Sequence, residues 1–100
     1  SMATYVRSRI RDDKVTVFMK DGCPYCRNAL ELLKYVCAPE CLQEFDITGL
    51  EDVQDYFQQT TGQRTVPRVF IGKHCIGGLS DLERISCKLP AMLQRIGARK

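Results

Sequence analysis

Two cysteines separated by two residues carry the clearest chemical signal in this sequence. The stretch Cys23-Pro24-Tyr25-Cys26 follows an Asp21-Gly22 break and precedes a segment of helical periodicity. Two sulfurs at this spacing in a tight turn can close into a disulfide and open again. A C-x-x-C motif between a strand and a helix is typical of thiol–disulfide exchange. The motif therefore predicts a redox-active dithiol.

The position of this dithiol predicts different roles for its two cysteines. Cys23 falls at the start of the expected helix, where free N–H groups and the helix dipole favour a thiolate. Lys20 and Arg27 lie nearby in the sequence and could add to this effect. Cys26 lies one turn further in and should be better protected. We expect Cys23 to be the nucleophile and Cys26 the resolving thiol, with Cys23 also a good leaving group.

A zinc site is the alternative interpretation of the same cysteines. Four of them have the spacing C-x2-C-x10-C-x3-C, and two neighbouring residues could supply further ligands: Cys23, Cys26, Cys37, Cys41 and His74-Cys75. The ten-residue gap, however, has the apolar pattern of a helix about 15 Å long, which would hold the two pairs apart. Zinc needs its sulfurs within about 2.3 Å of one point. We therefore favour the redox interpretation and expect no metal.

Hydrophobic periodicity predicts the elements that must position the dithiol. We expect helices over residues 4–12, from Pro24 to Pro39, between Thr48 and Gly62, from Ser80, and from Pro90, with strands over 14–19, 42–47, 68–71 and 74–76. Thr48 with Glu51, and Ser80 with Glu83, have the spacing of capping boxes.

The order of these elements predicts the fold class. The first two strands flank a helix and should form a parallel βαβ unit, because parallel neighbours need a crossover connection. The last two strands meet at Gly72-Lys73 and should form an antiparallel hairpin. The sequence thus predicts an α/β fold with a mixed four-stranded sheet flanked by helices, in one domain over residues 1–100.

Composition narrows the function classes. Of the 100 residues, 44% are hydrophobic and 27% charged, the net charge is +3, and six are cysteines. The charge is too small and dispersed to favour nucleic acid, and no apolar run is long enough for a membrane span. Residues 1–7 have no apolar stretch of the secretory type, so we expect a cytoplasmic protein with reduced thiols. Ser1 before Met2 is interpreted as a remnant of a cleaved expression tag.

Several motifs together resemble the dithiol glutaredoxins, and in particular the small cytosolic vertebrate type. They run through nearly the whole chain: residues 20–26, 64–72, 76–78 and 80–82. The resemblance implies a thioredoxin fold in which Pro67 follows a cis peptide bond. It also implies a monomeric, glutathione-dependent thiol–disulfide oxidoreductase that reduces protein–glutathione mixed disulfides and protein disulfides. Glutathione would be the co-substrate.

The resemblance further implies a glutathione groove. The positions that match the glycine carboxylate end of glutathione are Lys20, Gln54 and Arg64. Those beside its cysteinyl backbone are Thr65, Val66 and Pro67, and those at its γ-glutamyl end are Gly78, Ser80 and Asp81. Tyr25 would flank the sulfur. The chemistry agrees for Asp81, which could hold an ammonium group. Two plainer interpretations stay open: a solvated helix surface for Gln54, and helix capping for Ser80 and Asp81.

A second function of the same family is the alternative. Some glutaredoxins hold an iron–sulfur cluster between two subunits with the first cysteine and two glutathiones. Pro24 argues against this, because cluster-binding relatives more often have a small polar residue there.

The sequence departs from many relatives at Leu79, where they have a cysteine after the two glycines. For Cys37, Cys41, Cys75 and Cys87 we expect buried or incidental packing, with a Cys37–Cys41 bridge left open.

Overall fold

The computed structural model describes residues 1–100 and confirms the predicted order of helices and strands. The elements are α1 (Met2–Arg9), β1 (Val15–Met19), α2 (Pro24–Val36), β2 (Leu42–Asp46), α3 (Glu51–Thr61), β3 (Arg68–Ile71), β4 (His74–Gly77), α4 (Leu79–Arg84) and α5 (Leu89–Arg95), with short 3-10 turns at Pro39–Cys41 and Ser86–Lys88. Helix α1 lies earlier than the predicted 4–12. The Ser1 hydroxyl caps its first turn, and Ile10 already has an extended backbone.

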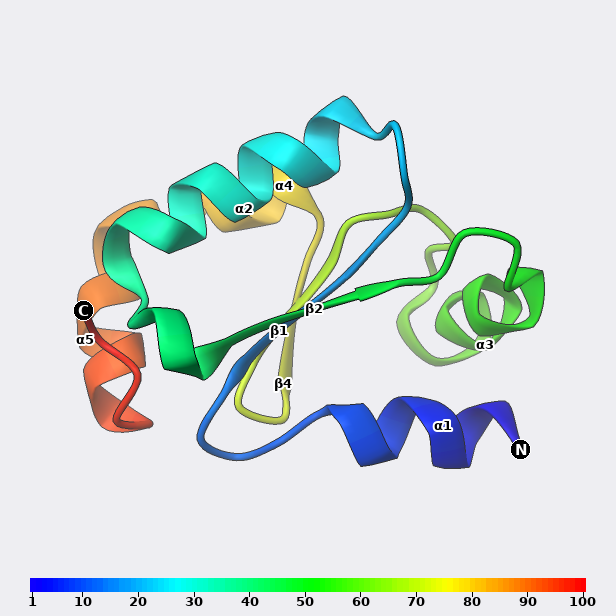
Figure 1. Ribbon diagram of the computed structural model, residues 1–100, viewed down its shortest axis with the longest axis horizontal. Coiled ribbons are helices and arrows are strands. Elements are labelled where there is room, and N and C mark those ends of the chain that lie inside the picture. The colour runs from blue at the N-terminus through cyan, green and yellow to red at the C-terminus, as the bar shows by residue number, and fades with distance from the viewer.

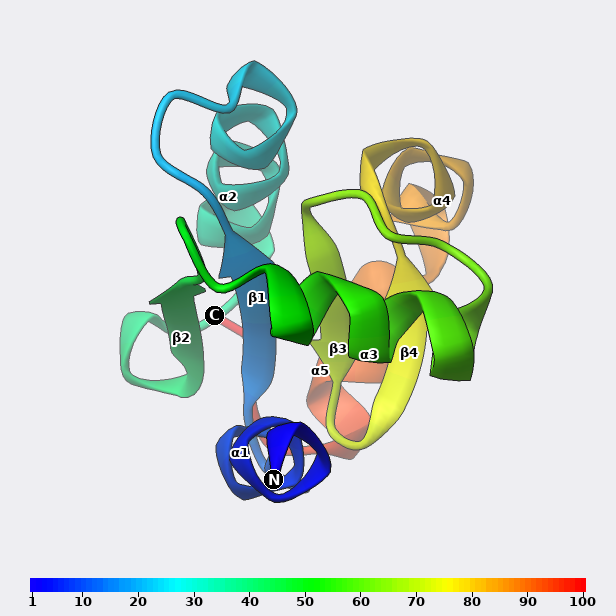
Figure 2. The same ribbon diagram turned by 90° about the vertical axis from the view of Figure 1, so that its right-hand side faces the viewer.

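The four strands form one mixed sheet in the order β2-β1-β3-β4 (Figure 2). Strand β1 runs parallel to β2, with Val17 opposite Glu44. Strand β3 is antiparallel to both β1 and β4. The predicted βαβ unit and hairpin are therefore both confirmed, and the parallel strand β1 lies inside the sheet.

Each face of the sheet is covered by its own set of helices. Figure 1 shows α2, α4 and α5 on one side and α1 and α3 on the other. Alternation along β1 supplies both cores, because successive side chains point to opposite faces. Val15 and Val17 join the core under α2, α4 and α5, while Phe18 joins the core under α1 and α3. No helix is long and apolar enough to cross a membrane.

Both predicted capping boxes are wrong in register. Thr48 does not cap α3: its N–H and its hydroxyl both donate to Asp46, and α3 begins at Glu51, after a turn through Gly49. Ser80 lies inside α4, whose cap is Gly78, and the carboxylate that reaches back to the Gly78 N–H is that of Asp81. Helix α3 therefore has Leu50 as its N-cap without a side-chain hydrogen bond, and in α4 Asp81 takes the role that the pattern gave to Glu83.

Candidate active site

The sequence around the dithiol fixes where helix α2 begins. Gly22 has a φ of 71°, a left-handed conformation that ends the extended chain after β1. Cys23 follows with an extended backbone and is the N-cap of α2. Pro24 takes the first helical position, where its missing N–H costs no hydrogen bond. The chain thereby places the Cys23 sulfur at the open end of the helix, as predicted.

The two sulfurs have different surroundings. Cys23 is half-buried, whereas Cys26 is only 1% exposed. The backbone N–H of Cys26 donates to Cys23 Sγ over 3.2 Å, which stabilises negative charge on that sulfur. Burial, followed by the hydrogen bond to Cys23 and the nearby Cys23 charge, raises the pKa of Cys26 to about 12. Cys26 is therefore a thiol at neutral pH.

A groove of about 650 Å³ opens beside the dithiol. Its lining includes seven of the residues singled out from the sequence: Tyr25, Thr65, Val66, Pro67, Gly78, Ser80 and Asp81. Tyr25 is 66% exposed, so its ring is available to a ligand. The Val66–Pro67 peptide bond is cis, as the resemblance implied. Three separate stretches of sequence thus meet around one space.

Asp81 is an anionic group of this groove that is held in place by hydrogen bonds. Its Oδ2 accepts the Gly78 N–H over 2.9 Å, and its Oδ1 accepts from Arg84 over 3.1 Å. The hydrogen bond from Gly78, then that from Arg84 and its charge, hold the pKa of Asp81 below its usual range. Gly77 is needed for this contact, because its φ is 119° and a Cβ there would collide with the Asp81 carboxylate. The capping interpretation of Asp81 is therefore confirmed, and the carboxylate is also fixed at the groove.

Lys20, Gln54 and Arg64 form a second group outside the lining of this groove. Lys20 Nζ donates to Gln54 Oε1 over 3.4 Å, and Gln54 Nε2 donates to the Arg64 carbonyl over 3.0 Å. Gln54 is only 7% exposed, so the interpretation as a solvated surface residue is wrong. The Arg64 side chain pairs with Asp55 at 3.0 Å in an exposed ion pair. Gln54 thus hydrogen-bonds to both Lys20 and Arg64, two cationic residues from distant segments of the chain.

Arg68 is a groove residue that the sequence alone did not reveal. It was predicted only as part of a strand, yet it lines the groove and is 3% exposed. Its guanidinium donates to neutral acceptors only: the Thr65 and Pro67 carbonyls, Gln63 Oε1 and, more weakly, Thr65 Oγ1. A buried arginine without a bonded carboxylate leaves positive charge at the groove wall. An arginine directly after Pro67 is the only signal that could have indicated it.

The other cysteines do not gather around a metal position. Cys37 and Cys41 lie beyond the opposite end of α2 from the dithiol, so the helix separates the two pairs as predicted. No group of three or more His, Cys, Asp or Glu side chains has an arrangement that could hold a metal ion. Cys37 is buried, as predicted, Cys41 and Cys75 are half-buried, and Cys87 is exposed; all six thiols are free.

Comparison with known proteins agrees with this geometry. The family model for glutaredoxin matches residues 15–76. The chain is 60% identical to chicken (Gallus gallus) glutaredoxin-1 over 96 residues, which cover 95% of each chain. It is 51% identical to the human protein of the same name over 100 residues, 94% of each chain.

Solved structures show the same fold. A mutated buckwheat glutaredoxin superimposes with a TM-score of 0.85 at 30% identity, covering 97% of this chain and 91% of that one. The buckwheat glutaredoxin–glutathione complex gives a TM-score of 0.84 at 28% identity with the same coverage. The sheet topology, the helix-capping dithiol and these matches over nearly the full length lead to one conclusion. The chain belongs to the glutaredoxin family of glutathione-dependent thiol–disulfide oxidoreductases.

Proposed function

We propose that this glutaredoxin reduces protein–glutathione mixed disulfides through Cys23 and reduces protein disulfides through Cys23 and Cys26 together. The observation that carries the proposal is the asymmetry of the dithiol. Cys23 caps α2 and accepts an N–H at its sulfur, while Cys26 is buried with a pKa of about 12. The Cys23 sulfur is therefore suited to nucleophilic attack, and Cys26 is suited to remain a protonated thiol until the mixed disulfide has formed.

For a glutathionylated protein the reaction has two exchanges. The Cys23 thiolate attacks the glutathione sulfur, the protein–glutathione S–S bond breaks, and the protein leaves as a thiolate that takes up a proton. Cys23 then has a disulfide to glutathione. The thiolate of a second glutathione attacks the glutathionyl sulfur, so that oxidised glutathione leaves and the Cys23 thiolate is restored. No electrons are needed beyond those of the thiols.

A protein disulfide needs Cys26 as well. Cys23 attacks one sulfur of the substrate, which forms a mixed disulfide and releases the other substrate sulfur as a thiol. Cys26 then loses its proton and attacks the Cys23 sulfur, which releases the second substrate thiol and leaves a Cys23–Cys26 disulfide. Two glutathiones reduce that bond in two further exchanges and leave as oxidised glutathione.

The groove, together with the group of Lys20, Gln54 and Arg64 outside its lining, offers complementary groups along the length of glutathione. The fixed Asp81 carboxylate, with Gly78 and Ser80, suits the γ-glutamyl end, where an ammonium group needs an anion. Thr65, Val66 and Pro67 line the middle, and Tyr25 flanks the sulfur. Lys20 and Arg64, linked through Gln54, suit the glycine carboxylate. The buckwheat relative whose structure is a glutathione complex supports the same ligand here.

The proposed setting follows from the same chemistry. The partners are glutathione and glutathionylated or disulfide-containing proteins, and the proposed form is a monomer in the cytoplasm. A compartment with abundant reduced glutathione is required, because the second exchange consumes it.

The test is glutathione release from a glutathionylated peptide by the reduced protein. We expect rapid turnover by the unmodified chain and by Cys26→Ser, and none by Cys23→Ser. Cys41→Ser is the matched control, because it removes a half-buried thiol beyond the other end of α2. Turnover by Cys23→Ser would overturn the assignment of the nucleophile. A folded, inactive wild-type protein would direct attention to the iron–sulfur alternative.

A further inference from the structure

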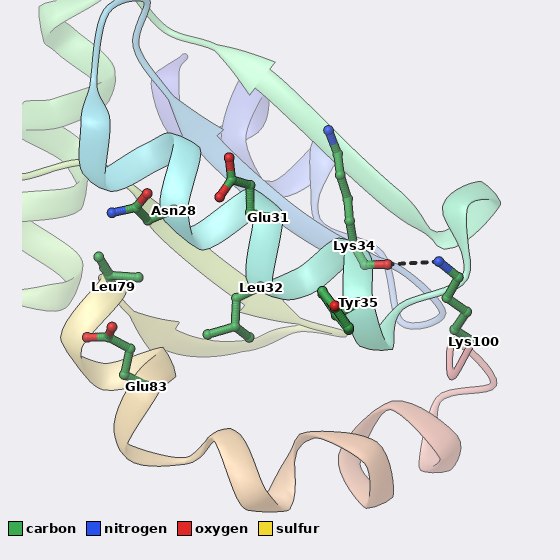
Figure 3. Close-up of a pocket in the computed structure, with 8 residues that line it drawn as sticks. All are labelled: Asn28, Glu31, Leu32, Lys34, Tyr35, Leu79, Glu83 and Lys100. Atoms are coloured by element: carbon green, nitrogen blue, oxygen red, sulfur yellow. Dashed lines mark hydrogen bonds between the residues drawn. The ribbon is translucent and has the colours of Figure 1, made fainter.

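A second groove, of about 650 Å³, lies between α2 and α4, and the reaction above makes no use of it (Figure 3). Its lining includes two glutamates and two lysines: Glu31, Glu83, Lys34 and Lys100. Figure 3 shows the Lys100 ammonium at the Lys34 carbonyl, to which it donates over 3.2 Å. Because both signs of charge are present, the electrostatics of this groove favour no class of ligand. The hydrogen bonds that join the chain after β1 to the chain after β2 are more specific.

The chains that leave β1 and β2 stay joined after the two strands end. Strand β1 ends at Met19 and β2 ends at Asp46. The Ile47 N–H donates to the Met19 carbonyl over 2.8 Å, which continues the parallel pairing. Further along the first chain, the Asp21 N–H donates to Thr48 Oγ1 over 2.9 Å. A side-chain hydroxyl here takes the place of the backbone carbonyl that a strand would supply.

The Thr48 hydroxyl is oriented by the carboxylate of Asp46. Asp46 accepts from the Thr48 hydroxyl and, over 2.8 Å, from the Thr48 N–H. These two hydrogen bonds hold the pKa of Asp46 below its usual range, so the carboxylate is charged at neutral pH. A hydroxyl that donates to a charged group is a better acceptor itself, because hydrogen bonds in a chain polarise one another. Thr48 Oγ1 is therefore an oriented acceptor for the Asp21 N–H.

Local structure accounts for only part of this arrangement. An aspartate that accepts the N–H two residues further on forms a common turn, which explains the bond from the Thr48 N–H. It does not explain the contact of Thr48 with Asp21, which is 27 residues away in the sequence. Thr48 does not cap α3, and Asp21, Asp46 and Thr48 are all exposed, so the contact contributes nothing to the core. What the contact holds is the segment that leads to the dithiol.

This segment carries Lys20, directly before Asp21. The Lys20 ammonium has no ion pair, and its hydrogen bond to Gln54 Oε1 is 3.4 Å, at the long end of the range. A lysine side chain is flexible, so this contact alone fixes the position of the charge weakly. The backbone is fixed on both sides of Lys20, by the Met19 carbonyl before it and by the Asp21 N–H after it. The position of the Lys20 charge therefore depends on these backbone contacts.

We propose that Thr48 is a positioning residue for glutathione, because its hydroxyl holds the Asp21 N–H and thereby places Lys20 at the glycine carboxylate. The inference rests on the proposed function, in which Lys20 serves that end of glutathione. Thr48 is not in the lining of the candidate glutathione groove and acts through Lys20. Cys23 is placed by α2, which it caps, so loss of the Thr48 hydroxyl should leave the exchange at its sulfur unchanged.

The experiment compares two substrates that differ only in one charge. The first is the mixed disulfide of cysteine and glutathione, and the second is the same disulfide with the glycine carboxylate converted to an amide. With glutathione fixed as the reductant, kcat/KM for the disulfide reports the first exchange. Thr48→Val removes the hydroxyl and keeps the shape of the side chain. We expect it to lower kcat/KM about three- to fivefold for the glutathione disulfide and less than about twofold for the amide.

Control variants connect the effect to the hydroxyl and to Lys20. Thr48→Ser keeps the hydroxyl and should retain the wild-type kcat/KM for both substrates. Thr60→Val makes the same change as Thr48→Val on an exposed part of α3, where the hydroxyl donates to the Tyr56 carbonyl, and should have no effect. Lys20→Met should lower kcat/KM for the glutathione disulfide at least about tenfold. Thr48→Val should add nothing in the Lys20→Met protein, because it acts through the same charge.

The outcomes separate this inference from the proposed function. No turnover of either substrate by the unmodified protein would mean that the proposed function fails. If Lys20→Met affected both substrates equally, or neither, the proposed role of Lys20 would fail, and the role of Thr48 with it. If Lys20→Met were selective but Thr48→Val had no effect or affected both substrates equally, the role of Thr48 alone would be overturned. A further loss on adding Thr48→Val to Lys20→Met would overturn it as well.

Discussion

Helix α2 has a pair of cysteines at each end, and the two cysteines that flank the helix, Cys23 and Cys37, have different surroundings. At the N-terminus, Cys23 is the half-buried cap and accepts a backbone N–H. At the C-terminus, Cys37 is 1% exposed, and its thiol donates to the Ala38 carbonyl over 3.4 Å. An isolated β-bridge between Cys37 and Arg99 pairs that end of the helix with the residues that follow α5.

The difference follows from the position of each sulfur and from its burial. The start of a helix offers unpaired N–H groups, which favour a thiolate, whereas its end offers carbonyls, which favour the protonated thiol. Burial, with smaller effects from Cys41 and Glu40, raises the pKa of Cys37 to about 11. Cysteine content therefore says little about reactivity until each thiol is placed on its element.

Removing one cysteine from each end gives the largest contrast. Cys23→Ser should lower glutathione release from a glutathionylated peptide at least about a thousandfold, because the nucleophile is lost. Cys37→Ala should keep the wild-type rate and cost about 1 kcal/mol of stability for the lost sulfur contacts. Steady-state assays and thermal unfolding measure both. Equal activity losses would show that the two ends are not functionally distinct.

The second cysteine of each pair provides the next contrast. Cys26→Ser should reduce a protein disulfide no faster than the uncatalysed reaction with glutathione, because the mixed disulfide lacks its resolving thiol. The same variant should still release glutathione from a glutathionylated peptide. Cys41→Ser should do both. Reduction of insulin disulfides, measured alongside the peptide assay, checks both activities. Loss of both activities in Cys26→Ser would contradict the proposal that glutathione release needs Cys23 alone.

Alkylation measures the thiolate population at each end directly. Raising a thiol pKa from 9.0 to about 11 lowers the thiolate fraction at neutral pH about 100-fold. In the folded protein, iodoacetamide should therefore modify Cys23 first, while Cys26 and Cys37 react only on unfolding. Peptide mapping by mass spectrometry after timed quenching gives the rates. Early modification of Cys37 would contradict the account.

Alkaline pH should reveal the buried thiols through stability. Above pH 9 the unfolded chain loses the Cys37 proton, whereas the folded chain keeps it until about pH 11. Unfolding then releases a proton, so stability is complete below pH 9 and falls as the pH rises through this window. Cys26 should extend the fall to about pH 12. Urea unfolding between pH 8.5 and 11 should show a slope shallower by about 1.4 kcal/mol per pH unit in Cys37→Ala. An unchanged slope would contradict the raised pKa of Cys37.

Local sequence patterns were enough to predict the main architecture. Apolar alternation indicated the strands, and Asp21-Gly22 before Cys23-Pro24 indicated where α2 begins. The predicted starts of α3 and α4 are wrong, because the capping pattern does not reveal which of several neighbouring side-chain oxygens accepts a given backbone N–H. In one case Asp46 accepts hydrogen bonds from the N–H and the hydroxyl of Thr48, and in the other Asp81 accepts the Gly78 N–H.

Long-range contacts explain why part of the site was missed or left open. Gln54 lies on a helix with many polar residues, yet it is buried, and its amide donates to the carbonyl of Arg64, ten residues further along the chain. Arg68 looks like an ordinary strand residue, yet the chain from Gln63 to Pro67 folds over it and supplies its acceptors. Such burial depends on loop paths, which have no periodicity to detect.

The most direct test of the account is to trap the first exchange and find which sulfur carries glutathione. The Cys26→Ser protein would be mixed with one equivalent of glutathionylated peptide, quenched with acid, and mapped by mass spectrometry without reduction. We predict a single adduct of one glutathione on Cys23 and release of the peptide as a free thiol. Glutathione on Cys37 or Cys41, or on several cysteines equally, would contradict the claim that the N-terminal end of α2 selects the reactive thiol.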